Sequence, residues 1–292
     1  PHSSFLIPHS SFLIPHSSSL IPHSSFLIPQ YMNLSLIGKN ALVGGASAGI
    51  GRAVAIELAA LGAQVILVAR TESALQETIA ALDAAQGQQH RYIVADFSDS
   101  KMLLEKVRQL IEDTDIHILV NNTGGPPGGL ITEATENAFA NAWHNHLICN
   151  QLLAQAVLPG MKKAGYGRIL NIISTSVKEP LDNLGVSNTT RWAVAGWAKT
   201  WANEVGQWGI TVNNILPGYT RTGRLMEIVK NRAASSGQSA ETVESQLKNH
   251  VPARRFAEPA EVAAAVAFLS SPAAGYINGV NLPVDGGRTK SL

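Results

Sequence analysis

Short apolar runs alternate with amphipathic stretches from residue 32 to the end of the chain. The apolar runs are rich in Val, Ile and Leu, which is typical of strands buried on both faces of a parallel sheet. The stretches between them repeat apolar positions every three or four residues, as an amphipathic helix does. This alternation predicts an α/β fold in which helices cover both faces of a parallel sheet.

No linker interrupts the predicted elements. We expect strands at residues 41–43, 64–69, 91–95, 116–121, 168–173, 210–216 and 280–284. We expect helices at residues 49–61 and 73–85, from Ser98 or Ser100 to residue 112, within 135–161, and at 187–207 and 259–270. The order predicts a doubly wound sheet in three α/β/α layers, as a single domain over residues 32–292.

Residues 1–31 consist mainly of a heptad repeat of Pro-His-Ser-Ser-Phe-Leu-Ile, with Ser19 replacing Phe in the third copy. Proline in every copy breaks a helix, which argues against a coiled coil. The regularly spaced histidines could in principle bind a metal. A translated DNA repeat, or a start codon placed too far upstream, is the simpler interpretation, and we expect this segment to lie outside the fold.

The alternation also changes at about residues 221–256, where the chain is polar and contains Ser235-Ser236-Gly237. A long insertion after the sixth strand is typical of a lid over a site at the carboxyl ends of the strands. A solvated helical excursion without a function would give the same pattern. The sequence leaves both interpretations open.

Composition narrows the possible partners. Charged residues make up 15% and the net charge is +1, so nothing favours binding to nucleic acid or to an anionic membrane. No apolar run is long enough for a membrane span. The only cysteine, Cys149, cannot form an internal disulfide, which favours a reducing compartment, the cytoplasm, and we expect it to be a small buried side chain on a helix.

A glycine-rich turn directly follows the first predicted strand and opens a helix. Its sequence is Gly44-Gly45-Ala46-Ser47-Ala48-Gly49-Ile50-Gly51. Glycines let the backbone approach a pyrophosphate, and the helix N-terminus supplies free N–H groups and a favourable dipole. The strand–turn–helix context therefore predicts a dinucleotide site of the Rossmann type.

The chain resembles the short-chain dehydrogenase/reductase family at this turn, whose fingerprint is Thr-Gly-x-x-x-Gly-x-Gly, although Gly44 stands at the Thr position. The resemblance continues in four further segments, which span the chain in the family's order. They are Asn121-Asn122-Thr123-Gly124, 167–174 with Ser174 at the catalytic Ser position, Pro217-Gly218 with Thr222, and 283–287. The style of the sequence is closest to 3-oxoacyl-[acyl-carrier-protein] reductases.

The resemblance implies a set of cofactor-binding residues and a preference for NADP(H) over NAD(H). The second strand ends with Arg70 and has no acid to hold a ribose 2′-hydroxyl until Glu72, while an Arg suits a 2′-phosphate, with Arg52 as a possible assistant. Arg70 could also be a solvated surface residue. The complete predicted set is Gly45, Ser47, Gly49, Ile50, Gly51, Arg70, Asp96, Phe97, Asn122, Gly124, Arg191, Pro217, Gly218, Thr220 and Thr222.

The family's catalytic Asn, Ser, Tyr and Lys are replaced at three of the four positions. Alignment by the family's spacing places the catalytic set at His146, Ser174, Ser187 and Arg191, of which Ser174 alone is retained. A serine hydroxyl is a far weaker acid than a phenol, and Arg191 cannot relay protons but can stabilise a developing alkoxide. His146 or a water chain is the predicted proton source, although His146 could also be an ordinary helix residue.

Three functions fit these residues. The first, which we favour, is an NADP(H)-dependent oxidoreductase that interconverts a small-molecule carbonyl and a secondary alcohol, with 3-oxoacyl thioesters as one candidate. The second is a non-catalytic nucleotide-binding protein, a sensor or an oligomer partner. The third is a structural protein with a vestigial site, which the intact glycine turn opposes. The resemblance also implies a homodimer or homotetramer, with tryptophans of the 187–207 helix either at an interface or in the core.

Overall fold

The computed structural model describes residues 32–291, and the repeat of residues 1–31 lies outside them. Within the described chain, the strands are β1 (Asn40–Gly44), β2 (Gln64–Ala69), β3 (Arg91–Val94), β4 (Ile118–Asn121), β5 (Gly167–Ile172), β6 (Ile210–Pro217) and β7 (Asn281–Val284). They form one parallel sheet in the order β3-β2-β1-β4-β5-β6-β7. The predicted doubly wound sheet is confirmed.

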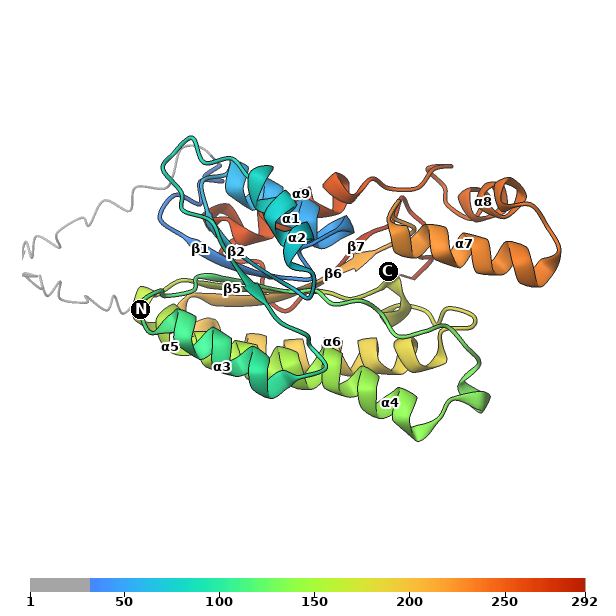
Figure 1. Ribbon diagram of the computed structural model, residues 1–292, viewed down its shortest axis with the longest axis horizontal. Helices are drawn as coiled ribbons and strands as arrows, with labels where there is room; N and C mark the ends of the chain where they lie inside the picture. Colours follow the sequence, from blue (N-terminus) through green and yellow to red (C-terminus); the bar gives the residue numbers. More distant parts are fainter. Residues whose placement is uncertain (1–31, 292) are drawn as a thin grey trace, which may run out of the picture. The chain divides into compact units, whose positions relative to one another are not determined.

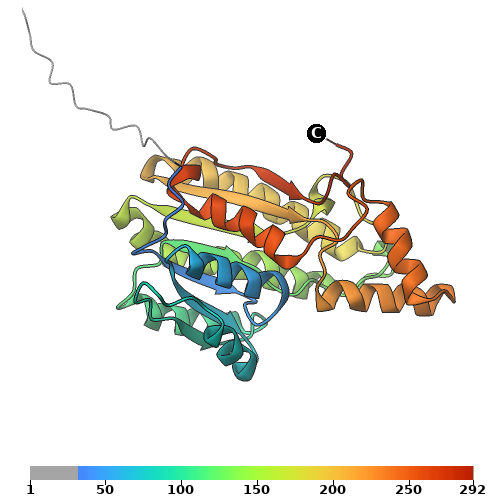
Figure 2. The same cartoon turned by 90° about the horizontal axis from the view of Figure 1, so that it is seen from above.

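Helices cover both faces of this sheet. They are α1 (Gly49–Ala60), α2 (Glu72–Ala80), α3 (Ser100–Ile111), α4 (Glu136–Trp143), α5 (Cys149–Ala164), α6 (Gly185–Val205), α7 (Gly223–Ser236), α8 (Ala240–Asn249) and α9 (Pro259–Ser270). Figure 1 shows α1, α2 and α9 on one face and α3, α5 and α6 on the other. Figure 2 shows α1 and α9 side by side, and the two helices pack against each other.

The apolar core lies in two layers because successive strand residues point to opposite faces. Val43 and Val120 pack with Leu58 of α1 and Val266 of α9. Leu42 and Leu119 face the other way, toward the layer that includes Leu153 of α5. Each fully buried side chain of this size contributes roughly 1.5–3 kcal/mol. The central strands β1, β2, β4, β5 and β6 are therefore buried on both faces, as the continuous apolar runs predict.

The polar-looking segment after β6 forms two helices with a small core of their own. Apolar residues from α7, α8 and the following loop pack together, namely Leu225, Val229, Val243, Leu247 and Phe256. Gly237 ends α7 with φ of 67°, which lets the chain turn into α8. The pair lies beyond the end of the sheet at which β6 finishes (Figure 1). Its position fits the predicted lid, whose movement stays a prediction.

The structure differs from the sequence-based prediction at several helix boundaries, and the helix predicted at residues 187–207 is α6, Gly185–Val205. The cap of α3 is Asp99, whose Oδ1 accepts a hydrogen bond from the Met102 N–H at 3.0 Å, so the predicted caps Ser98 and Ser100 are wrong. The helix predicted to end at residue 85 ends at Ala80, because Asp83 folds the following chain into a turn by accepting from the Ala85 N–H. A π-helical turn, His144–Ile148, separates α4 from α5.

Candidate active site

The glycine turn after β1 is shaped by close backbone contacts. Gly45 has φ of 57° and Gly49 has φ of 55°, both in the left-handed region. A Cβ atom on Gly45 would lie 2.7 Å from Nδ2 of Asn122, and one on Gly51 would overlap the carbonyl oxygen of Gly45. The first turn of α1 has neither a side-chain cap nor an acidic residue, so its N–H groups remain available to an anion.

Asn122 ties this turn to the end of β4. Its Nδ2 donates to the carbonyl oxygen of Gly44 at 3.1 Å and to that of Gly45 at 3.4 Å. A Cβ atom on Gly44 would lie 2.9 Å from the carbonyl oxygen of Asn122 and 3.1 Å from Cζ of Phe97. The turn is therefore packed so tightly at residue 44 that a side chain would not fit, which explains why glycine and not threonine stands there.

The predicted adenine-side residues lie at the ends of β2 and β3. Arg70 has a side chain that is 76% exposed, and its Nη1 is 3.8 Å from Oδ2 of Asp96. Hydrogen bonds from Ser98 and the nearby Arg70 lower the pKa of Asp96 below its usual value. Phe97 is buried, and its carbonyl oxygen accepts a hydrogen bond from the thiol of Cys149, which is buried on α5 as predicted. The residues predicted for the pyrophosphate and the adenine thus lie at the carboxyl ends of β1, β2 and β3.

The loop after β6 reaches the glycine turn from the opposite side. Thr222 caps α7, and its Cγ2 is 3.2 Å from the position that a Cβ on Gly49 would take. A Cβ on Gly218 would lie 2.7 Å from Cα of Asp285, which brings the C-terminal segment against this loop. Thr220 is buried and donates to the carbonyl oxygen of Gly218. These contacts place Pro217 to Thr222 beside the predicted dinucleotide site.

Arg191 is a buried cation on α6 and is 8% exposed. Its Nη1 donates to the carbonyl oxygen of Ile172 at 3.2 Å, and its Nη2 lies 3.8 Å from where a Cβ on Gly125 would be. No carboxylate of the described residues forms an ion pair with it. Burial alone lowers its pKa to about 10, so it stays charged near neutral pH.

The two predicted serines lie on the helix of this cation and directly after the strand that it contacts. Ser187 lies one helical turn before Arg191 on α6, so the two residues share a face of the helix. Ser174 follows β5, and its Oγ accepts from the N–H of Ser176 at 3.0 Å, which leaves its own hydroxyl hydrogen free to donate. Ser187 is half-buried. The arrangement offers hydroxyl donors and a positive charge to an oxygen atom.

His146 lies in the π-helical turn and is 2% exposed. Its Nδ1 is 2.6 Å from Oγ1 of Thr123. Burial, and to a smaller extent the charge of Arg191, lowers its pKa to about 2. The imidazole is therefore neutral at physiological pH, and the predicted proton donation by an imidazolium does not fit this environment. Single π-helical turns within α-helices are frequently found at functional sites.

Two contributors to this region were missing from the sequence-based set. Thr123 is the hydrogen-bond partner of His146. It stands where the family has an alanine, and this substitution could have indicated its role from the sequence. Arg224 on α7 donates from Nη2 to the carbonyl oxygen of Pro126 at 2.9 Å. That contact joins the predicted lid to the Gly/Pro-rich loop after β4, and no sequence pattern indicated it.

Four asparagines form a hydrogen-bonded ladder across adjacent strands. Nδ2 of Asn121 donates to Oδ1 of Asn171 at 2.8 Å, and Nδ2 of Asn171 donates to Oδ1 of Asn214 at 2.9 Å. Asn214 in turn donates to Asn281 at 2.8 Å. The residues are in register from β4 to β7. Oδ1 of Asn121 has no hydrogen-bond partner in the described part of the chain.

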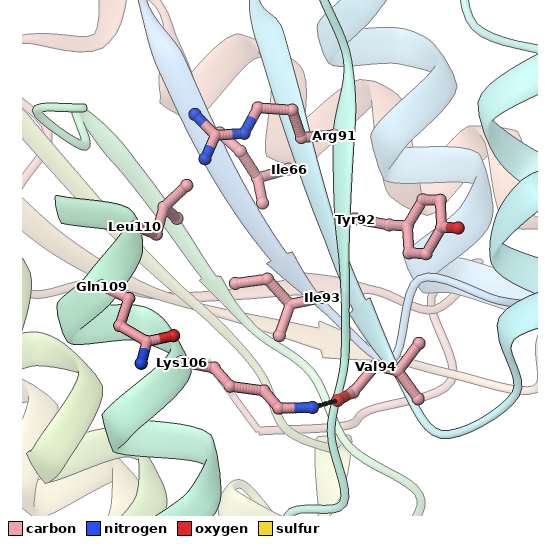
Figure 3. A pocket seen from close by; sticks show the side chains of 8 residues that line it. All are labelled: Ile66, Arg91, Tyr92, Ile93, Val94, Lys106, Gln109 and Leu110. Carbon is pink, nitrogen blue, oxygen red and sulfur yellow. Dashed lines mark hydrogen bonds between the residues drawn. The ribbon is translucent and has the colours of Figure 1, made fainter. Parts of the chain in front are cut away.

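A cavity of about 390 Å³ lies elsewhere, between β3 and α3 (Figure 3). Its lining is Ile66, Arg91, Tyr92, Ile93, Val94, Lys106, Gln109 and Leu110. None of the predicted site residues belongs to it. Nζ of Lys106 donates across it to the carbonyl oxygen of Val94 at 2.7 Å (Figure 3). Over residues 32–291 there is no cluster of metal-ligating side chains, and no helix is both long and apolar enough to cross a membrane.

Comparison with known proteins finds relatives that match most of this chain. The family model described as Enoyl-(Acyl carrier protein) reductase matches residues 45–289. The 3-oxoacyl-[acyl-carrier-protein] reductase FabG of Vibrio cholerae is 36% identical over 258 residues, which are 87% of this chain and 98% of that protein. FabG of Escherichia coli is 37% identical over 252 residues, 86% of this chain and 97% of that protein.

A solved structure has the same fold as this chain. L-sorbose reductase from Gluconobacter frateurii, complexed with NADPH and L-sorbose, superimposes with a TM-score of 0.83 at 32% identity. The match covers 89% of this chain and 100% of that one. The similarity therefore extends over the whole described sheet and its helices.

Proposed function

Since the chain belongs to the short-chain dehydrogenase/reductase family, we propose that it is an NADP(H)-dependent oxidoreductase that interconverts a carbonyl and a secondary alcohol. The observation that carries the proposal is the glycine turn, where Gly45 and Gly49 adopt positive φ beside the uncapped start of α1. Gly45, Ser47, Gly49, Ile50 and Gly51 would hold the pyrophosphate. The bound cofactor supplies or accepts the electron pair of the reaction.

Two features of the adenine side support NADP(H) over NAD(H). Arg70 is exposed at the end of β2, and its ion pair with Asp96 is long and solvated, so the guanidinium is free to meet a 2′-phosphate. Glu72 is the first acid after β2, and its Oε1 accepts a hydrogen bond from the Tyr92 hydroxyl at 2.8 Å. Glu72 is therefore already engaged and does not serve a ribose 2′-hydroxyl. The solved L-sorbose reductase also holds NADPH.

The proposed chemistry relies on electrostatic stabilisation. Ser174 and Ser187 would donate hydrogen bonds to the substrate oxygen, and Arg191 would stabilise the charge that develops there. The neutral His146–Thr123 pair would hold the loop after β4 in place and offer a hydrogen bond rather than a proton. We infer that the proton comes from solvent, because no described group in the site combines an accessible position with a pKa near neutrality.

The relatives also suggest which substrates to assay first. FabG proteins act on 3-oxoacyl groups by name, so 3-oxoacyl thioesters are the first substrates to assay. We also propose a cytoplasmic homodimer or homotetramer, with residues 1–31 outside the catalytic domain and 221–256 as its lid. Exposed apolar side chains of α4, α6 and the π-turn, namely Trp143, Ile148 and Trp192, support a subunit interface there. Sedimentation at micromolar concentration tests the oligomer.

The second candidate is a nucleotide-binding protein without catalysis. The pKa of His146, lowered to about 2, favours it, because the site then has no obvious general acid. The polar residues at the replaced positions would serve ligand binding in that case. The two candidates differ in a single observable, turnover.

The experiment is an assay of NADPH oxidation by the full chain with 3-oxoacyl thioesters, oxo acids, diketones and quinones. Turnover that Ser174→Ala and Arg191→Ala both suppress, while Arg108→Ala on the exposed face of α3 does not, supports the proposed enzyme. Fluorescence titration of NADPH runs in parallel. NADPH binding without turnover on the whole panel favours the non-catalytic alternative.

A further inference from the structure

The charge of Arg191 has no counter-charge in the described chain. Its one hydrogen bond goes to a neutral carbonyl oxygen, that of Ile172. A guanidinium has five N–H donors, so most of its donors remain unused. A buried cation without a partner is costly, so an anionic ligand that supplies the counter-charge would be bound favourably.

Cofactor phosphates bound at the glycine turn would be too far away to be that ligand. The pyrophosphate belongs at the turn after β1, whereas Arg191 contacts the end of β5, and β4 lies between these strands. Neighbouring strands are about 4.8 Å apart, so two steps put the phosphates roughly 10 Å away. The nicotinamide ribose can occupy one or two donors of Arg191, but its hydroxyls are neutral and leave the charge uncompensated.

The loop after β4 presents backbone and no side chain to Nη2 of Arg191. Gly125 has no side chain, and Nη2 of Arg191 is the atom nearest to the place where one would be. Ser187 fills far less space than the tyrosine that the family has at this position. A planar group that approaches along this side meets a forked set of N–H donors, which matches a carboxylate in geometry as well as in charge.

We infer that the substrate is an oxo acid, whose carboxylate pairs with Arg191 while its carbonyl oxygen accepts from Ser187 and Ser174. This inference rests on the proposed function and narrows its substrate. Ser187 and Arg191 are neighbours at i and i+4, with Cβ atoms about 5–6 Å apart, so one small molecule can contact both side chains if its carboxylate and carbonyl are close together. That span selects 2-oxo and 3-oxo acids over neutral ketones, esters and thioesters.

The reaction balances without another reagent. The carbonyl carbon receives a hydrogen with its electron pair from NADPH, which leaves as NADP⁺, and the oxygen takes one proton from solvent. The carboxylate keeps its charge throughout. Arg191 therefore has a partner in both the oxo acid and the hydroxy acid product.

The test compares matched substrates on the full chain. kcat/KM is measured with NADPH for 2-oxo and 3-oxo acids of equal chain length and for their methyl esters and thioesters. We expect the acids to be preferred by about 10- to 100-fold, which is the range for one charge-assisted hydrogen-bonded pair. Arg191→Gln should abolish the preference, because kcat/KM falls further for the acids than for the esters and thioesters, and Arg191→Lys should keep part of it. Arg108→Gln is the charge-matched control and should change neither quantity.

The experiment distinguishes failure of the oxo-acid inference from failure of the proposed reductase function. If esters or thioesters react as fast as the acids, the oxo-acid inference is overturned while the proposed reductase stands. If no carbonyl compound reacts, the proposed reductase fails, and the anion site is judged by thermal melting of the NADPH complex with 2-oxo and 3-oxo acids. A rise in Tm that Arg191→Gln removes supports a carboxylate site, and no rise overturns it.

Discussion

Nδ1 of His146 lies 2.6 Å from Oγ1 of Thr123, and this contact joins the π-turn before α5 to the loop after β4. His146 is 2% exposed and Thr123 is half-buried. Removing the hydroxyl leaves a buried imidazole nitrogen without a partner. Thr123→Val should therefore lower the free energy of unfolding by about 1–3 kcal/mol.

Chemical denaturation measures that loss, and Thr123→Ser is the matched control because it keeps the hydroxyl. The valine variant should lose more stability than the serine variant. Equal midpoints for the two variants would show that the His146 contact contributes nothing to stability.

Gly45→Ala should abolish NADPH binding. The new Cβ would lie 2.7 Å from Nδ2 of Asn122 in addition to requiring positive φ. Gly237→Ala is the control, since it has φ of 67° with nothing within 4 Å of the new Cβ. The control pays only the left-handed strain of about 1–2 kcal/mol. Fluorescence titration should show NADPH binding in the control and none in Gly45→Ala, and normal binding in both would remove the glycine turn from the site.

Arg70→Ala should weaken NADPH binding by about 10- to 100-fold and leave NADH binding unchanged, because a charge-assisted contact to the 2′-phosphate is lost. The measurement is the KM for each cofactor. Glu72→Gln should affect neither, since Glu72 bonds to Tyr92. A parallel loss for both cofactors in Arg70→Ala would mean that this residue does not read the 2′-phosphate.

Stability should fall as the pH drops below about 6.5. Burial and the charge of Lys39 lower the pKa of His117 below its ordinary value of 6.5, and its Nδ1 accepts a hydrogen bond from the Asn40 N–H at 3.1 Å. The unfolded chain therefore binds the proton more readily, and folding stability is full above pH 6.5 and declines below it. His146, with its pKa lowered to about 2, adds to the same trend over a wider range.

Urea unfolding at a series of pH values measures this slope. His117→Gln keeps a hydrogen-bonding group without a titration and should make the slope shallower between pH 6.5 and 5. An unchanged slope in that variant would assign the pH dependence to other groups.

Asn171→Leu should destabilise the sheet more than Asn281→Ala does. Asn171 is fully buried and both donates to and accepts from neighbouring amides, so its replacement leaves two buried partners unpaired, at about 1–3 kcal/mol each. Asn281 is exposed, and water replaces its contact. Denaturation midpoints that fall equally in the two variants would contradict this difference.

The strands and most helices could be predicted from the sequence because apolar periodicity responds to burial directly. Residues 64–69 and 259–270 were predicted with the bounds that the structure shows. The π-turn was not predictable, since one inserted residue in a helix leaves the apolar pattern on both sides intact. The cap of α3 was missed because Ser98, Asp99 and Ser100 are all good capping residues, and only the backbone chooses among them.

The candidate site also has features that the sequence predicts and features that it does not. The glycine turn could be located because glycine is required where a Cβ has no room. The state of His146 could not, because its pKa depends on how completely other segments bury it. The bond between Arg224 and Pro126 joins residues 98 positions apart in sequence, and neither residue type signals the other.

Every amide of the ladder points the same way, with its nitrogen toward β7 and its oxygen toward β4. Rotating Asn171 alone would set two NH₂ groups against each other on one side and two oxygens on the other. The four amides can therefore reverse only together, so the row behaves as a single dipole with two collective states. The row ends at β4 with the free acceptor of Asn121. The aligned amides therefore give the sheet a polarity that runs across the strands, perpendicular to the direction of the chain.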